Sequence, residues 1–528
     1  MPKRVLYPII SILLFSVPWF GGPGYFLFGA FVPMLLIQEE FNGPKKKGIK
    51  NRFFTWYTLT FLCWNIVNVY WIKNAVWIGA IAAIIINTIL MVVPFMIYHY
   101  VWKRAHRALA YTLFVTAWIA AEYIYLHGEI SFPWILLGNG FANDVKAVQW
   151  YEYTGLFGGS IWVLIMNLLI FKAVKKYRNA KNILHFILPV LVAVVPVTIS
   201  LMIYYNYEEK EAPIVVEVVQ PNIFEEEKFM TMTQREQINI ILELSQNAPQ
   251  NVDFIVTPET SVDHGIWENK LEENITLGWF KRFLFDNYPS SSFVLGATTY
   301  RRYDENNRSI TSRTNPNIDF WYDAYNTALF IDTTDIIRVY HKNKLVIGAE
   351  TMPFYEQLKF LEKFSLDLGG FTGLMGRDME RTVFVKDDNK KVGVAICYES
   401  IYGEYCGEFI DNGAESLFVI TNDSWWGNTA GHRQHLAFAR LRAIEFRRSI
   451  ARSANTGISG FIDQRGDIIS RTRWDERTSQ TGRINLNDKI TFYAKYGDMA
   501  GRLACYVFLL GILYYVAYSR RKKDHIVK

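Results

Sequence analysis

The sequence predicts an α-helical membrane domain with several spans, joined to a layered α/β domain. Three observations support this: where the hydrophobic residues lie, where the basic residues lie, and an alternation of short apolar runs with helical segments. Of the 528 residues, 51% are hydrophobic and 20% are charged. The hydrophobic residues are concentrated in positions 1–206 and in the last 28. This composition excludes a disordered chain, a repeat protein and, with four cysteines, a disulfide scaffold.

The membrane part contains a series of apolar stretches. A span needs roughly 20 apolar residues, and most of the stretches reach this length with their flanks. The first two are short and are separated by a turn signal at 21–24, so we expect a hairpin of two short helices. A signal peptide is the alternative, because Lys3 and Arg4 precede an apolar run, but no clear cleavage site follows. The eight expected spans are 5–20, 25–37, 53–70, 75–98, 108–126, 155–173, 183–205 and 503–518.

The basic residues predict the orientation of these spans. Twenty Lys and Arg lie near the N-terminus, in 43–52, 103–107 and 172–181, and in 520–528. The alternate loops contain only Lys73 and Lys146. The positive-inside rule therefore places both termini in the cytoplasm and residues 207–500 outside. Since the net charge of +6 follows from this topology, we expect no nucleic-acid partner.

Residues 207–500 differ in pattern from the rest of the chain. Short β-rich runs alternate with helical segments, which is typical of a layered α/β domain. We therefore expect three regions: a membrane domain at 1–206, an extracytoplasmic domain at 207–500, and a final span with a basic cytoplasmic tail at 501–528. The expected strands are 214–219, 254–257, 293–297, 328–331, 336–340, 392–396 and 417–421, and the expected helices are 231–246, 276–286 and 432–448.

Three reactive side chains follow three of these strands. Glu259 comes after Pro258 at the end of one, Lys342 at the end of another, and Cys397 at the end of a third. Taken singly, they read as a solvated acid, a surface lysine and a buried small residue. Their combination favours a shared site, because α/β enzymes assemble sites from the ends of separate strands.

The residues around these positions resemble a known family. The segments 257–259, 340–345 and 397–399 are similar to the Glu-Lys-Cys triad of the nitrilase superfamily. The run Thr421-Asn-Asp-Ser-Trp-Trp-Gly427, the segments 434–445 and 452–457, and the arrangement of spans resemble the apolipoprotein N-acyltransferases. The resemblance implies an extracytoplasmic nitrilase-like αββα sandwich.

Two positions depart from the family pattern. The family has Leu-Val-Pro-Phe-Gly-Glu after the lysine, whereas this chain has Leu345-Val-Ile-Gly-Ala-Glu350. The family often places Trp where Phe229 stands. The resemblance still matches its second Glu to Glu350, and the departures bear on the loop around Ile347-Gly348-Ala349 and on substrate contacts at Phe229.

The resemblance assigns catalytic roles to Glu259, Lys342 and Cys397. A thiol is mostly protonated at neutral pH, so it needs a base. Glu259 is the candidate, and we expect burial to raise its pKa toward the useful range. Lys342 and the N–H of Tyr398 would stabilise an oxyanion. As supporting and substrate-binding residues we expect Glu350, Tyr398, Glu399, Phe229, Trp425 and Trp426.

The resemblance also implies the reaction. An acyl chain from a phosphatidylethanolamine-like phospholipid would pass to Cys397 as a thioester. It would then pass to the α-amino group of a lipoprotein's diacylglyceryl-cysteine, at the periplasmic face of the bacterial inner membrane. We expect a monomer that needs the lipid bilayer but no cofactor. His432 and His435 lack the pattern of a metal site, so we expect no metal.

Several alternatives remain from the sequence. A membrane-tethered amidase is the closest, with water as the acceptor. A non-catalytic transporter or binding protein is less favoured, because Glu122 and Lys73 are the main charges in the spans and lie near their ends. The aromatic and glycine-rich segment 351–376 is either a helix and loop packed on the core or a mobile lid that contacts lipid. Cys397 and Cys406 could also form a disulfide.

Overall fold

The computed structural model describes residues 3–42, 53–314, 319–358, 374–387 and 389–527. The chain divides into two compact units, which are described separately. The first comprises Met1–Lys73, Trp77–Asn206 and Tyr496–Lys528, and the second comprises Asn74–Val76 and Tyr207–Lys495.

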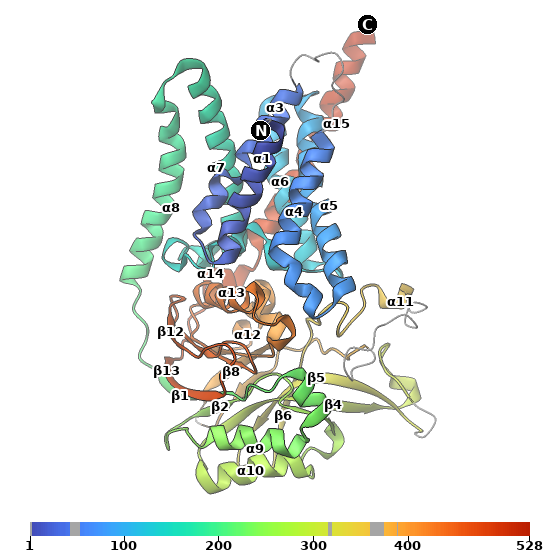
Figure 1. Ribbon diagram of the computed structural model, residues 1–528, viewed down its shortest axis with the longest axis vertical. Coiled ribbons are helices and arrows are strands. Elements are labelled where there is room, and N and C mark those ends of the chain that lie inside the picture. The colour runs from blue at the N-terminus through green and yellow to red at the C-terminus, as the bar shows by residue number, and fades with distance from the viewer. Residues whose placement is uncertain (1–2, 43–52, 315–318, 359–373, 388, 528) are drawn as a thin grey trace. The chain divides into compact units, whose positions relative to one another are not determined.

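The first unit is a bundle of helices (Figure 1). Within the described residues, five helical segments are long and apolar enough to cross a membrane: Trp77–Trp102, Arg107–His127, Tyr151–Ala180, Ile183–Asn206 and Met499–Arg521. Two shorter apolar segments cover Arg4–Phe20 and Gly24–Glu39. Between them the chain turns at Gly21, where φ is +88° and an L side chain would be strained. The helices are α1 (Lys3–Ser16), α2 (Leu27–Ala30), α3 (Val32–Asn42), α4 (Phe53–Val69), α5 (Trp77–Trp102), α6 (Arg107–His127), α7 (Tyr151–Ala180), α8 (Ile187–Asn206) and α15 (Met499–Val527).

The second unit contains two β-sheets. In the described residues one has the strand order β13-β1-β2-β4-β5-β6, with β3 paired to β4, and the other has the order β12-β11-β10-β9-β8-β7. The strands are β1 (Pro213–Gln220), β2 (Phe254–Val256), β3 (Val262–Trp267), β4 (Ser292–Tyr303), β5 (Trp321–Ile331), β6 (Arg338–His341), β7 (Val383–Val385), β8 (Lys391–Ile396), β9 (Ser416–Thr421), β10 (Ile450–Ala454), β11 (Gly460–Ile462), β12 (Ile468–Arg471) and β13 (Thr478–Asn485).

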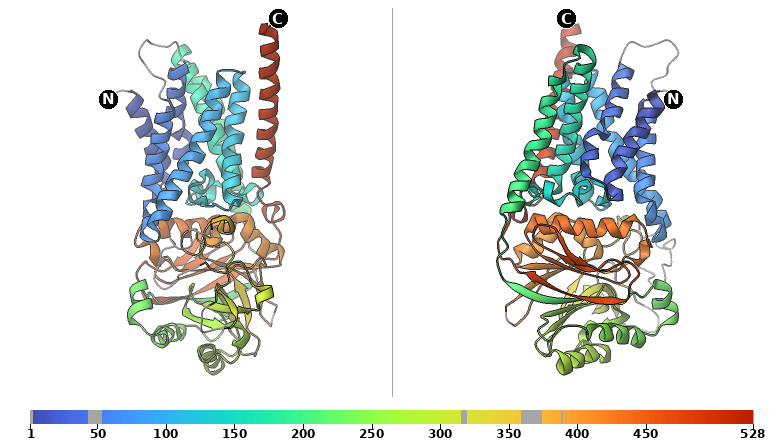
Figure 2. Two further views of the ribbon diagram at one scale, coloured as in Figure 1. Left: turned by 90° about the vertical axis from the view of Figure 1, so that its right-hand side faces the viewer. Right: turned by 60° about the vertical axis from the view of Figure 1, so that its left-hand side comes forward.

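The two sheets are stacked face to face, with helices on both outer faces (Figures 1 and 2). Phe254 packs against Phe418, and Phe330 against Phe384, at centroid distances of 5.3 and 5.4 Å between the sheets. Helices α9 and α10 cover the first sheet, with Ile238, Leu277 and other buried apolar residues between helix and strand. The second sheet carries α12 and α13. The helices of this unit are α9 (Gln234–Ser245), α10 (Ile275–Asn287), α11 (Tyr355–Leu358), α12 (Gly403–Asp411), α13 (Ala430–Phe446) and α14 (Phe492–Tyr496).

Every strand and helix expected in this unit is present, with shifted limits. The expected strands at 293–297 and 328–331 are parts of longer strands, β4 and β5, which pair with each other in antiparallel register. The expected strand at 336–340 begins later, at Arg338. The remaining strands and the helices α12 and α14 are not expected from the sequence.

Candidate active site

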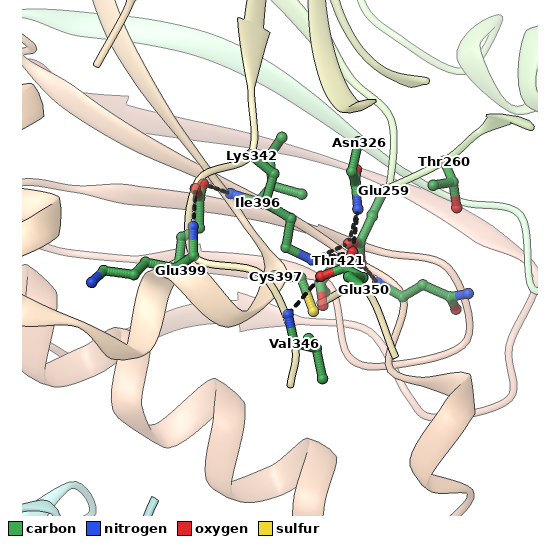
Figure 3. Close-up of polar contacts among 12 residues, drawn as sticks. Glu259, Thr260, Asn326, Lys342, Val346, Glu350, Ile396, Cys397, Glu399 and Thr421 are labelled. Carbon is green, nitrogen blue, oxygen red and sulfur yellow. Dashed lines mark hydrogen bonds and ion pairs between the residues drawn. The ribbon is translucent and has the colours of Figure 1, made fainter. Parts of the chain in front are cut away.

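Glu259, Lys342 and Cys397 lie together, although they come from different sheets (Figure 3). Glu259 follows β2 and Lys342 follows β6, both in the first sheet. Cys397 follows β8 in the second sheet. All three are buried, with 7%, 1% and 6% of their surfaces exposed. The structure thus assembles the three residues predicted to form the triad from the ends of three strands.

Lys342 is the centre of an ion-pair network. Its Nζ donates to Glu259 Oε1 and to Glu350 Oε1, each at 2.9 Å. Burial alone lowers the pKa of Lys342, but the negative charges of Glu259 and Glu350 reverse this and hold the pKa well above its usual value. The lysine is therefore a permanent cation beside the thiol.

Asn326 links the two carboxylates that flank Lys342. Its Nδ2 donates to Glu259 Oε1 at 2.7 Å and to Glu350 Oε1 at 2.9 Å. Asn326 lies within β5 and was not predicted, because an Asn in a strand carries no motif that marks it. Asn326 lies beside Lys342 because β5 pairs with β6, and the N–H of Lys342 donates to Asn326 O. The sequence alone does not give this pairing.

The predicted direction of the Glu259 pKa is wrong. Burial raises the pKa of Glu259, as expected, but the positive charge of Lys342 opposes it. Hydrogen bonds from Lys342, Asn326 and the Asn422 N–H act in the same direction as that charge, and the pKa ends below its usual value. Glu259 is therefore ionised at neutral pH. Its carboxylate can accept a proton although its pKa is not raised.

Cys397 follows β8 directly and is the first residue of a short 3-10 helix, Cys397–Ile401, where its backbone is strained. Its φ is +51°, a left-handed conformation that costs a residue other than glycine about 1–3 kcal/mol. Burial raises the pKa of its thiol well above the usual value, and the charge of Glu259 adds to this, whereas Lys342 and the Thr421 hydroxyl oppose it. The thiol is thus protonated at rest and requires a base.

Glu399 connects the cysteine turn to the lysine strand. Its carboxylate accepts the N–H of Ile396 at 2.8 Å and the N–H of Asn343 at 2.7 Å. The hydroxyls of Tyr340 and Tyr405 also donate to it. Glu399 therefore fixes the two backbone segments next to Cys397 and Lys342.

The loop after Lys342 returns Glu350 to the site. Glu350 Oε2 accepts the N–H of Val346 at 2.8 Å, and the Glu350 N–H donates to Val346 O. Gly348 has a φ of +86° in this turn. The Ile347-Gly348-Ala349 sequence, which departs from the family pattern, thus supplies a glycine where the turn requires one.

A second ion-pair cluster holds the end of β6. His341, the residue before Lys342, contacts Glu268 Oε1 through Nε2 at 2.6 Å. Arg301 donates to Glu268 Oε2 at 2.8 Å. Burial raises the pKa of Glu268, but the hydrogen bond and charge of His341, and then those of Arg301, lower it to about 2. Glu268 was not predicted from the sequence.

The aromatic residues predicted to bind substrate form two separate ring contacts. The rings of Phe229 and Trp425 are 6.4 Å apart, and both are half-buried. Trp426 packs edge-on against the ring of His435 at 5.3 Å. The ring of Tyr398 is buried and lies 5.3 Å from that of Tyr402. Most of the predicted lid, 351–376, lies outside the described residues.

The remaining cysteine and histidine predictions concern the interior of the domain. Cys397 and Cys406 are both buried free thiols, so the disulfide alternative is wrong for the described structure. His432 stacks on Trp474 with a centroid distance of 4.2 Å. His435 contacts the backbone of Cys397.

Comparison with known proteins gives the family. The model for the carbon-nitrogen hydrolase family matches residues 216–492, and the model for the apolipoprotein N-acyltransferase N-terminal domain matches residues 11–169. The chain belongs to the carbon-nitrogen hydrolase family, among the apolipoprotein N-acyltransferases. The match to the N-terminal domain therefore precedes the match to the carbon-nitrogen hydrolase family along the chain.

Curated apolipoprotein N-acyltransferases resemble the chain over most of its length. The protein of Chlorobaculum tepidum is 27% identical, over 99% of this chain and 98% of its own. The protein of Geobacter metallireducens is 24% identical, over 81% and 80%. Among solved structures, Nit3 of Saccharomyces cerevisiae, a member of branch 10 of the nitrilase superfamily, is 15% identical, covers 55% of this chain and 94% of its own, and has a TM-score of 0.35.

Proposed function

We propose that this apolipoprotein N-acyltransferase moves an acyl chain from a membrane phospholipid to Cys397, and from there to the amino group of a lipoprotein. The observation that supports this most directly is the buried set of Glu259, Lys342 and Cys397 (Figure 3). It combines a protonated thiol, an ionised carboxylate and a fixed cation. These are the three groups that acyl transfer through a thioester requires.

The first step forms the thioester. The sulfur of Cys397 attacks the ester carbonyl of the phospholipid while Glu259 takes the thiol proton. Lys342 and the N–H of Tyr398 stabilise the oxyanion of the tetrahedral intermediate. When the C–O bond to the glycerol breaks, Glu259 returns the proton to the leaving alkoxide. The products are acyl-Cys397 and a lysophospholipid.

The second step uses the same groups with an amine. The neutral α-amino group of a diacylglyceryl-cysteine attacks the thioester carbonyl, and Glu259 accepts the proton that the nitrogen loses. The C–S bond breaks and the proton passes to the sulfur, which regenerates the thiol. The product is an N-acylated lipoprotein. No cofactor enters this balance, and all three residues belong to one chain, so a monomer suffices.

The supporting residues act on the geometry of these steps. Glu350 and Asn326 hold the ammonium of Lys342 and the carboxylate of Glu259 in a fixed relation. Glu399 holds the backbone before Cys397 and after Lys342. We assign substrate contacts to Phe229, Trp425 and Trp426, whose half-buried rings suit acyl chains.

The proposed donor follows from the proposed topology. The basic residues of the sequence support eight spans, with both termini in the cytoplasm and residues 207–500 in the periplasm. The periplasm offers no obvious supply of acyl-CoA, so the acyl chain comes from the bilayer. A phosphatidylethanolamine-like lipid is the donor class that the family resemblance supports.

Transfer is tested with both substrates present. The purified full-length chain in detergent micelles is incubated with phosphatidylethanolamine and a synthetic diacylglyceryl-cysteine peptide, and the peptide is weighed by mass spectrometry. We expect the peptide to gain one acyl chain, and we expect the Cys397→Ser protein to be folded but inactive. Full activity of Cys397→Ser would contradict the mechanism. Hydrolysis of small amides without acyl transfer would favour the tethered amidase.

A further inference from the structure

The ring of His435 lies directly behind the cysteine turn. His435 belongs to α13 and is fully buried. Its Nε2 is 3.1 Å from the carbonyl oxygen of Cys397 and 2.9 Å from Ser400 Oγ. The Ser400 hydroxyl also donates to the Cys397 carbonyl, at 2.8 Å. Two side chains therefore converge on one backbone oxygen, that of the nucleophile.

The opposite side of the ring is held by a buried ion pair. His435 Nδ1 is 3.1 Å from Asp423 Oδ1 and 3.2 Å from Arg452 Nη2. Arg452 Nη2 also donates to Asp423 Oδ2 at 2.6 Å. All three side chains are fully buried. Burial, and then the charge of Arg452, lowers the pKa of His435, so the ring is neutral at physiological pH.

The partners of the ring indicate which nitrogen carries the proton. Arg452 can only donate, so it favours an unprotonated Nδ1. The Cys397 carbonyl can only accept, so it favours a protonated Nε2. Only Asp423 Oδ1 favours the opposite tautomer, and it already accepts the Thr421 hydroxyl at 2.9 Å. The tautomer protonated at Nε2 satisfies two of these three fixed partners. In it Nε2–H points to Cys397 O and to Ser400 Oγ, which itself donates to Cys397 O.

The Cys397 carbonyl and the Tyr398 N–H belong to one planar peptide group. In a trans peptide the C=O and the N–H point in opposite directions, so fixing one fixes the other. The φ of +51° at Cys397 is a conformation that must be held by its surroundings. If the Cys397 carbonyl lost its hydrogen-bond partners, this peptide group could rotate. The Tyr398 N–H would then point in a different direction.

We propose that His435, held by Asp423 and Arg452, is a positioning residue that orients the Cys397–Tyr398 peptide so that the Tyr398 N–H meets the oxyanion. This inference rests on the proposed thioester mechanism. It names the residues that orient the Tyr398 N–H, the backbone donor of that mechanism. His435 does not touch the reacting atoms. It acts through the carbonyl on the far side of the peptide.

Two substitutions of His435 distinguish the roles of its two ring nitrogens. The amide nitrogen of Gln can occupy the position of Nε2 and donate to Cys397 O, whereas the shorter Asn reaches only the position of Nδ1. The rate of thioester formation is measured with phosphatidylethanolamine carrying a labelled acyl chain, in detergent micelles. The rate of Cys397 alkylation by iodoacetamide is measured in parallel, because alkylation passes through no oxyanion.

We expect His435→Asn to slow thioester formation about 100-fold, the lower end of the loss for one oxyanion donor, while alkylation changes less than about twofold. His435→Gln should recover most of the lost rate. Ser400→Ala, a small change next to an intact ring, should slow thioester formation about tenfold and leave alkylation unchanged.

Other results would overturn the proposal. Wild-type thioester rates in both His435→Asn and Ser400→Ala would show that the peptide needs no such support. An equal loss of thioester formation and alkylation in both variants would show a structural role only. If the unsubstituted protein is alkylated at Cys397 but forms no thioester, the proposed function fails first and this inference fails with it.

Discussion

At the residue scale, the role of Glu259 depends on the charge beside it. Its carboxylate is ionised because Lys342 and three hydrogen bonds outweigh burial. The sequence could predict the residue and its burial, but not the direction of its pKa. That direction is set by Lys342, which lies 83 positions away in the chain and 2.9 Å away in space.

Replacing Glu259 by Gln should remove the base while keeping the shape of the site. An amide cannot accept the thiol proton, so we expect thioester formation to fall by about 10²–10⁴-fold. The loss would be measured as the rate at which labelled acyl chain appears on Cys397. Glu243→Gln, at an exposed position of α9, is the matched control and should behave as the unsubstituted protein. Near-normal rates for Glu259→Gln would assign the base to another group.

Glu268 gives a prediction for pH dependence. Its pKa falls from 4.5 to about 2 on folding, which corresponds to about 3 kcal/mol. Because the pKa is lowered in the folded state, this stabilisation is complete above pH 4.5 and is lost as the pH falls toward 2. Glu268→Gln should therefore lower the thermal midpoint of the full-length protein at pH 7. At pH 3 the thermal midpoints of the variant and the unsubstituted protein should differ by less than at pH 7. A difference independent of pH would contradict this assignment.

At the scale of elements, the sequence predicted those strands that end in the site better than those that complete the sheets. β2, β8 and β9 consist mostly of apolar residues in unbroken runs, which a sequence pattern predicts well. β10, with the sequence Ile450-Ala-Arg-Ser-Ala454, and β13, Thr478–Asn485, are small or polar and read as loops. Their partners in the sheets, not their side chains, make them strands.

The approach of β4 to the Glu259 loop gives a prediction at this scale. A Cβ at Gly296 would lie 2.1 Å from Pro258 O and 2.8 Å from the Cα of Glu259. Since backbone atoms cannot yield cheaply, Gly296→Ala should displace Glu259 and reduce acyl transfer by about 100-fold or more. Gly278→Ala is the control, because its added methyl lies at an exposed position of α10 and meets nothing within 4 Å. If acyl transfer by Gly296→Ala equalled that of Gly278→Ala, the position of this loop would not limit catalysis.

At the scale of the whole molecule, the sequence alone predicted a membrane region and an α/β region, because hydropathy and strand periodicity act over long stretches. The spans that it predicts at 5–20, 25–37 and 53–70 stay predictions, because the helices there are short. Helix α4 has 17 residues, and the two preceding segments are also short. Whether these short helices span the bilayer depends less on their length than on how they pack against neighbouring helices.

The proposed topology predicts which parts of the chain are accessible from the periplasm. In cells with a permeabilised outer membrane, added protease should cut within residues 207–500 and leave a tag after Lys528 intact. Lysed cells, in which both faces are open, are the control and should lose the tag. Protection of 207–500 in intact inner membranes would reverse the orientation and remove the argument for a lipid acyl donor.

The central claim is that Cys397 accepts an acyl chain from phospholipid, and it is tested most directly without any acceptor. The full-length protein is incubated with phosphatidylethanolamine alone, and the peptide containing Cys397 is analysed by mass spectrometry before and after hydroxylamine. We predict an acyl adduct that hydroxylamine removes, together with one lysophospholipid for each adduct. A folded protein without any adduct would contradict the account and would direct attention to hydrolysis of small amides.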